Sequence, residues 1–138
     1  MSDKKEHLPF LITHHSSLIT HKNMSSVPKL ELYRLIDEAT ARGERVVVAT
    51  VAHTRGSTPQ RRGAKMLFFE GGRTAGTVGG GCVEAEVWAE AREALRTGRA
   101  SLQRFSLTAE DAAEEGMVCG GTMEIFLDVW GDKVISDE

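Results

Sequence analysis

The sequence predicts a single domain in the α/β to α+β range, in which a mixed β-sheet of about five strands is covered by two main helices and one short helix. A β-branched run at residues 45–52 indicates a strand buried on both faces. Apolar residues recur at helical spacing on both sides of this run, and apolar residues alternate along 123–129. The length of 138 residues suffices for one core but not for two.

The first helix is predicted by Leu32, Ile36 and Ala39, which share one helical face, and Gly43 stands where that helix should end. After the strand at 45–52, the chain enters a loop and then a predicted hairpin. The hairpin strands are expected at residues 64–70 and 73–78, joined by Gly71-Gly72, because both glycines tolerate positive φ.

A second helix is predicted to end at Gly98, because apolar residues recur on one face of the segment before it: Val83, Val87, Ala91, Ala94 and Leu95. Residues 100–107 are expected to form another strand. Thr108 to Asp111 resembles a capping box, which would open a short acidic helix closed by Gly116. The alternation along 123–129 then predicts a final strand with one apolar face.

Three parts of the chain are expected: a tail at 1–27 that is disordered or reflects a start codon assigned too early, a domain at 28–132, and a short tail at 133–138. The net charge of −3 gives no general attraction to nucleic acid or to an anionic membrane. No apolar run approaches the roughly 18 residues of a membrane span. Sparse cysteine without a signal peptide favours a reducing, cytoplasmic setting.

A glycine-rich turn precedes the second helix. Gly79, Gly80 and Gly81 would let the backbone approach a ligand, but the sixth position of a dinucleotide fingerprint is Glu84, so a plain nucleotide site is disfavoured. A turn that merely needs positive φ is the competing interpretation. The helix N-terminus would increase the reactivity of the Cys82 thiol, whereas the negative charge of Glu84 would decrease it. The reactivity of Cys82 therefore stays open.

A second Cys-Gly-Gly turn and a basic loop are the other candidate features. Cys119 precedes Gly120 and Gly121, and a disulfide between Cys119 and Cys82 stays open. The loop concentrates four cations in an acidic protein, which suits an anion site with Ser57 as an extra donor; a solvated loop is the alternative. These cations are Arg55, Arg61, Arg62 and Lys65.

Three stretches together resemble the N-terminal domain of the XdhC/CoxI family, which are accessory proteins for molybdenum hydroxylases such as xanthine dehydrogenase. The resemblance covers about residues 29–130. The three stretches are the Arg-Gly-Ser-x-Pro loop with Gly-Ala-Lys-Met66, Gly-Thr-Val-Gly-Gly-Gly-Cys-Val-Glu84, and Glu-Glu-Gly-Met-Val-Cys-Gly-Gly-Thr122.

This resemblance implies a chaperone, rather than an enzyme, that binds the molybdopterin (molybdenum) cofactor as cargo. Such a maturation factor holds the cofactor while a cysteine desulfurase sulfurates it, and inserts it into an apo-enzyme of the xanthine dehydrogenase or CO dehydrogenase type. Cys82 and Cys119 would lie at the metal end, with Glu84 beside the first, and the four loop cations at the phosphate. The glycine turns at 79–81 and 120–121 would allow close approach.

The resemblance also sets expectations about partners. Longer members carry a second, Rossmann-type domain, so a separate chain of that type is an expected partner, and we expect a homo-oligomer. Arg62 stands where many relatives are expected to have proline. Two alternatives stay open: a thiol oxidoreductase that uses Cys82 and Cys119, and a regulatory subunit of a molybdoenzyme complex without a ligand of its own.

Overall fold

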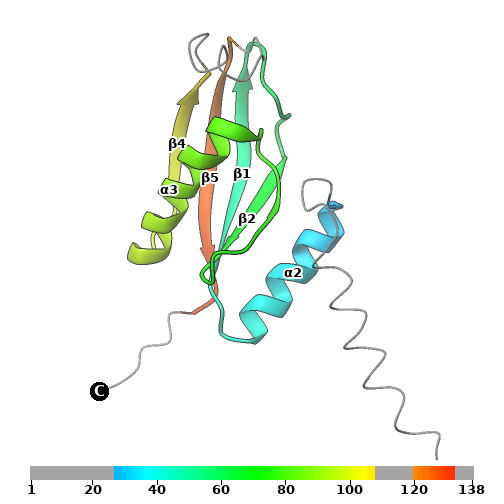
Figure 1. The fold of residues 1–138 in the computed structure, drawn as a ribbon, viewed down its shortest axis with the longest axis vertical. Helices are drawn as coiled ribbons and strands as arrows, with labels where there is room; N and C mark the ends of the chain where they lie inside the picture. The colour runs from blue at the N-terminus through cyan, green and yellow to red at the C-terminus, as the bar shows by residue number, and fades with distance from the viewer. Residues whose placement is uncertain (1–26, 108–119, 133–138) are drawn as a thin grey trace, which may run out of the picture.

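The computed structural model describes residues 27–107 and 120–132 (Figure 1). The predicted tail at 1–27 lies outside this part of the chain except for Val27, and the predicted tail at 133–138 lies wholly outside it. Gly131 and Asp132, at the end of the predicted domain, are described. The predicted short helix at 108–116 also lies outside the described residues. The described elements are α2 (Lys29–Ala41), β1 (Val46–Arg55), β2 (Lys65–Phe69), β3 (Thr74–Gly76), α3 (Gly81–Thr97), β4 (Ser101–Ser106) and β5 (Thr122–Trp130).

The five strands form one sheet in the order β3-β2-β1-β5-β4. This sheet and its two helices confirm the predicted single-domain class and place it at the α+β end of the predicted range. Every neighbouring pair is antiparallel, however, so the expected mixed sheet is wrong. The strands β3 and β4 run in the same direction and would form a parallel pair if they were neighbours. However, α3 connects β3 at one edge of the sheet to β4 at the other edge, so the two strands do not pair.

The two helices pack on opposite faces of the sheet. Strand residues alternate between the faces: Val47 and Ala49 of β1 join the cluster under α3, whereas Val46 and Val48 join the cluster under α2. This burial on both sides confirms the interpretation of the β-branched run. The rings of Phe68 and Trp88 stack with centroids 5.2 Å apart, which holds α3 against β2.

The local signals for helix ends and for the hairpin are confirmed. Gly98 ends α3 in the left-handed conformation with φ 69°, and its N–H donates to the carbonyl oxygen of Ala94 at 2.7 Å. Gly72 has φ 91° in the hairpin between β2 and β3. Within the described residues, neither helix is long and apolar enough to cross a membrane.

Neither of the two described helices covers one part of the sheet. The cluster under α2 contains strand residues of β1, β2 and β3 only, whereas the cluster under α3 reaches β4 and β5. We call the surface of β4, β5 and the last residues of β1 that faces away from α3 the open face. Two large apolar side chains lie on it exposed and opposite each other, Leu102 of β4 and Phe126 of β5.

Candidate functional site

All three glycine-containing motifs meet at one end of the sheet, where β1 ends and β5 begins; we call this the upper end, as it is drawn in Figure 1. Gly56 and Gly121 pack backbone against backbone: a Cβ added to Gly121 would overlap the carbonyl oxygen of Ser57 and lie 2.7 Å from that of Arg55. The N–H of Leu107 donates to the carbonyl oxygen of Gly121 at 2.9 Å, which ties this turn to the end of β4.

The loop after β1 also contacts the triple-glycine turn. A Cβ added to Gly79 would lie 2.8 Å from Cγ of Pro59, closer than real side chains approach each other. The loop that follows Arg55 therefore contacts the 120–121 turn at its start, through Gly56, and the 79–81 turn further on, through Pro59. Segments that lie far apart in the sequence are thus joined through positions where only glycine fits.

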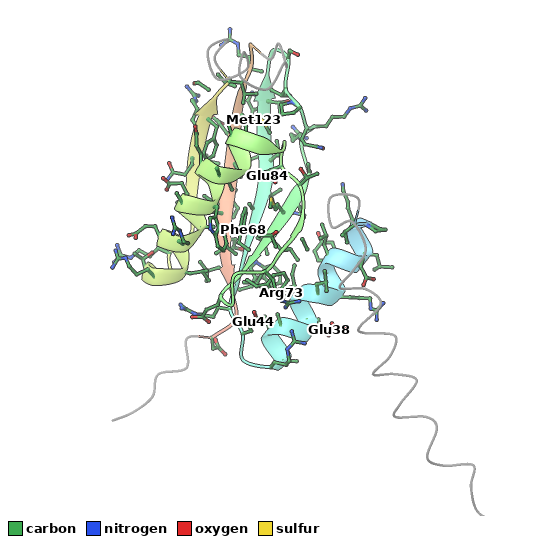
Figure 2. All side chains as sticks on the ribbon, in the orientation of Figure 1. Glu38, Glu44, Phe68, Arg73, Glu84 and Met123 are labelled. Carbon is green, nitrogen blue, oxygen red and sulfur yellow. The ribbon has the colours of Figure 1, made fainter. Side chains whose placement is uncertain are left out.

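The triple glycine forms a turn with positive φ at all three positions, 150°, 76° and 46° for residues 79–81. Glu84 in the first turn of α3 stabilises it, because its carboxylate accepts hydrogen bonds from the Thr77 hydroxyl and, at 3.0 Å, from the Gly80 N–H. Glu84 lies toward the upper end in Figure 2. The geometry of a positive-φ turn is confirmed, and Glu84 occupies one of the N–H groups that a ligand could have used.

A β-bulge in β1 decides which side chains reach the open face. The register of β1 against β5 shifts between Val51, opposite Ile125, and His53, opposite Glu124. Without the extra residue, strict alternation would turn His53 and Arg55 toward α3, as it does Val51. With it, His53 and Arg55 share the open face with Glu124, whose neighbours Met123 and Ile125 are buried under α3.

A cavity of about 530 Å³ opens on this face at the upper end. Its lining comes from the end of β1, the start of β5, the end of β4 and the glycine turn before β5. The lining residues are His53, Arg55, Gly56, Arg104, Gly120, Thr122 and Glu124.

The charges in this cavity are arranged around one carboxylate. Arg104 donates to Oε1 of Glu124 from Nε at 3.2 Å and from Nη2 at 2.6 Å. The hydrogen bond from Arg104, with smaller contributions from the charges of Arg104 and His53, lowers the pKa of Glu124 below its ordinary value, so the carboxylate is ionised near neutral pH. The cavity therefore offers cationic donors, a hydroxyl and an anionic acceptor together.

Only some of the predicted site residues lie at the cavity. Arg55 and Gly120 line the cavity, and Gly121 packs behind it. The loop residues Ser57, Arg61 and Arg62 lie outside the cavity lining, and all three are exposed.

The remaining predicted residues lie elsewhere. Lys65 donates from Nζ to the Thr50 hydroxyl at 2.7 Å on the face that carries α2. Cys82, exposed with its thiol free, stands with Glu84 in the first turn of α3, on the opposite face from the cavity. Cys119 lies outside the described residues, so its predicted role and a disulfide stay untested. In the part of the chain described, no three His, Cys, Asp or Glu side chains gather as a metal site.

Five cavity residues are not among the predicted site residues: His53, Gly56, Arg104, Thr122 and Glu124. Alternation signals for two of them were present, because Arg104 precedes the buried Phe105 and Glu124 lies between the buried Met123 and Ile125. Their convergence depends on the pairing of β4 with β5 and of β5 with β1, which no local pattern reveals.

Comparison with known proteins adds a family match. Residues 39–106 match the model of the XdhC and CoxI family. The chain is 40% identical over 68 residues to the molybdenum cofactor insertion chaperone PaoD of Escherichia coli, covering 49% of this chain and 21% of that protein. It is 31% identical over 88 residues to a probable xanthine dehydrogenase subunit of Bacillus subtilis, covering 64% of this chain and 27% of that protein.

The chain is also similar to a further relative and to a solved structure. The uncharacterized Escherichia coli protein YqeB is 38% identical over 84 residues, covering 61% of this chain and 15% of that protein. The crystal structure of a xanthine dehydrogenase from Bacillus halodurans superposes with a TM-score of 0.57 at 25% identity, covering 70% of this chain and 29% of that one. The chain thus spans less than a third of each of these proteins.

Proposed function

Because this chain belongs to the XdhC and CoxI family, we propose that it is an accessory chaperone that binds the molybdenum cofactor and delivers it to a molybdenum hydroxylase. A molybdenum-related accessory role is supported by its similarity to PaoD and to a probable xanthine dehydrogenase subunit. The structural observation that carries the proposal is the convergence of the three glycine-containing motifs beside one cavity.

The chemistry of the cavity suits such a cargo. The cofactor carries a phosphate, an oxygen-rich anionic metal centre and a flat pterin, and the cavity of about 530 Å³ lies within the size range of small-molecule sites. Arg55 and the Thr122 hydroxyl are donors suited to the phosphate. The close backbone packing of Gly56 on Gly121 leaves the rim of the cavity without side chains at that point.

Cys82 has a separate part in this proposal. A thiolate is a soft ligand suited to molybdenum or to its sulfido group, and Cys82 is exposed at the start of α3. Because the cavity lies on the other face of the sheet, we assign Cys82 to the stage at which the metal end is handed between proteins. A cysteine desulfurase for sulfuration, the recipient hydroxylase, a Rossmann-type chain and a second copy of this chain are the proposed partners.

The test is purification of the full chain from a host that makes molybdopterin, followed by oxidation of the bound pterin to its fluorescent form. We expect the wild type and Cys82→Ala to retain the cofactor equally, because Cys82 lies on the face away from the cavity, and Cys82→Ala to deliver about tenfold less of it to the apo-hydroxylase. Ala85→Ser, at an exposed position in the same helix, is the control.

Two results would contradict the proposal or part of it. A wild-type protein free of pterin, although the desulfurase is present, would overturn the chaperone function. Equal delivery by Cys82→Ala and the wild type would overturn the role of that residue alone. A reversible disulfide between the two cysteines would instead favour a thiol oxidoreductase.

A further inference from the structure

The cavity on the open face continues into an apolar surface. Phe126 follows Glu124 by two residues on the same side of β5, roughly 7 Å further along the strand. Leu102 of β4 lies opposite Phe126 of β5. Leu102 is 58% exposed and Phe126 is 40% exposed. One end of the site is therefore charged and the other presents an aromatic ring and an aliphatic side chain.

The charged end carries an acceptor where a simple anion site would carry only donors. Arg55 and Thr122 occupy opposite positions on β1 and β5, one step closer to the end of the sheet than His53 and Glu124. Arg104 contacts Oε1 of Glu124, which holds the carboxylate within the cavity wall. An ionised carboxylate repels a bare phosphate, so this arrangement suits a ligand that brings hydrogen-bond donors together with its anionic group.

The size, the acceptor and the aromatic rim point to one chemical class. A 2-amino-4-oxopyrimidine ring presents an amino group and a ring N–H side by side, and either can donate to Oε2 of Glu124 while Oε1 accepts from Arg104. Such a ring is flat and stacks on an aromatic side chain. Pterin phosphates and guanine nucleotides share this edge and both carry phosphate.

We propose that, within the cofactor site proposed above, Glu124 is the residue that selects the ligand, by accepting from the amino-pyrimidinone edge of the pterin while Arg55 donates to the phosphate and Phe126 lies against the ring. This inference rests on the proposed function for its choice of pterin over guanine. It makes Glu124 the residue that distinguishes ligands with an amino-pyrimidinone edge from other flat anions. Arg104 is then a positioning residue, because it acts through Glu124.

The test is a fluorescence titration of the full chain with neopterin monophosphate. Its matched ligands are the 2-oxo analogue, which lacks the amino group, unphosphorylated neopterin, guanosine monophosphate and inorganic phosphate. We expect the wild type to prefer neopterin monophosphate over the 2-oxo analogue by about tenfold or more, the effect of one charge-assisted pair. It should also bind neopterin monophosphate more tightly than guanosine monophosphate.

Two variants assign the residues. Glu124→Gln should abolish the preference over the 2-oxo analogue, and Arg55→Ala should lower the affinity for the phosphorylated pterin to that for neopterin. Asp128→Asn is the control, because Asp128 lies on the same side of β5 but accepts from the Trp130 indole N–H at 2.9 Å, outside the cavity lining. Should Glu124→Gln not fold, Thr122→Val tests the same cavity by weakening phosphate binding.

The outcomes separate this inference from the proposed function. An unchanged ligand preference in Glu124→Gln, in a protein that still retains cofactor during purification, overturns the inference and leaves the chaperone function standing. Tighter binding of guanosine monophosphate, or inorganic phosphate that competes as well as the pterin phosphate, overturns the choice of ligand. A Glu124-dependent preference in a protein that never carries cofactor supports the inference and contradicts the chaperone function.

Discussion

The two ends of the sheet handle their charged residues in different ways. At the lower end, where β1 begins, Arg45 bonds both carboxylate oxygens of Glu70, at 2.5 and 3.3 Å, and the carbonyl oxygen of Leu95 at 2.6 Å. Arg73 bonds Glu44 nearby at 3.2 Å and lies 4.1 Å from the centroid of the Phe69 ring. Figure 2 shows Glu44 and Arg73 toward this end, with Glu84 toward the other.

The upper end is built from backbone contacts instead. Gly56 packs on Gly121 and Pro59 on Gly79, and the polar side chains of the cavity face outward around the space that these contacts leave. Charges at the lower end thus stabilise the chain itself, whereas the glycines at the upper end leave the side chains there available to a ligand. Each of the following changes tests one side of this comparison.

The largest expected effect is at the upper end. Gly121→Ala would force a Cβ into the Ser57 carbonyl oxygen, and since both partners are backbone, neither can move without opening the loop. We expect the free energy of unfolding in urea to fall by about 2–3 kcal/mol or more. Gly120→Ala is the matched control, because no atom of the described residues lies within 4 Å of a Cβ there. Equal stability of the two variants would show that the backbone contact is not required.

An intermediate effect is expected at the lower end. Arg45→Ala removes the pair with Glu70 and leaves the Leu95 carbonyl oxygen without that donor, so we expect a loss of about 1–2 kcal/mol in the free energy of unfolding. Arg96→Ala, which removes an exposed pair with Glu93 within α3, should leave stability unchanged. If the two variants lose equal stability, the Arg45 contacts at the lower end stabilise the fold no more than an exposed ion pair does.

The smallest effect is a pH dependence of the same pair. Chiefly through its side-chain hydrogen bond, Arg45 holds the pKa of Glu70 below its ordinary 4.5. The folded chain thus binds this proton less tightly than the unfolded chain, so the stabilisation is complete above pH 4.5 and is lost as the pH falls through the lowered pKa. Because Glu70 is half exposed, we expect about 1 kcal/mol or less.

The measurement is the urea midpoint of the wild type and of Glu70→Gln from neutral pH down to acid. The difference between the two should be constant near neutral pH and shrink below pH 4.5. A difference that stays the same into acid would mean that the pair does not carry the effect.

Much of the fold could be predicted from the sequence because its signals are local. Helical spacing located α2 and α3, and Gly98 marked the end of α3 by its tolerance of positive φ. The β-branched run located β1, and Gly71-Gly72 located the hairpin, through interactions among residues close in the chain. The glycine motifs likewise indicated where backbone segments approach closely, and Gly121 is such a place.

The site could be predicted only in part. Arg55 and Gly120 were found from their motifs, whereas Arg104 and Glu124 belong to strands that look like ordinary alternating segments. The pairing of those strands is a contact between residues far apart in the chain, and the placement of β5 between β1 and β4 also made the sheet antiparallel.

Local patterns in the sequence indicated the helices and strands among the described residues, the positions that require glycine, and the family that the chain resembles. The tertiary structure alone decided which face carries the cavity. The extra residue between Val51 and His53 reverses the alternation of β1, and so places Arg55 beside Thr122 on the face away from Cys82. A bulge is a relation between two paired strands, so one strand read alone contains no record of it.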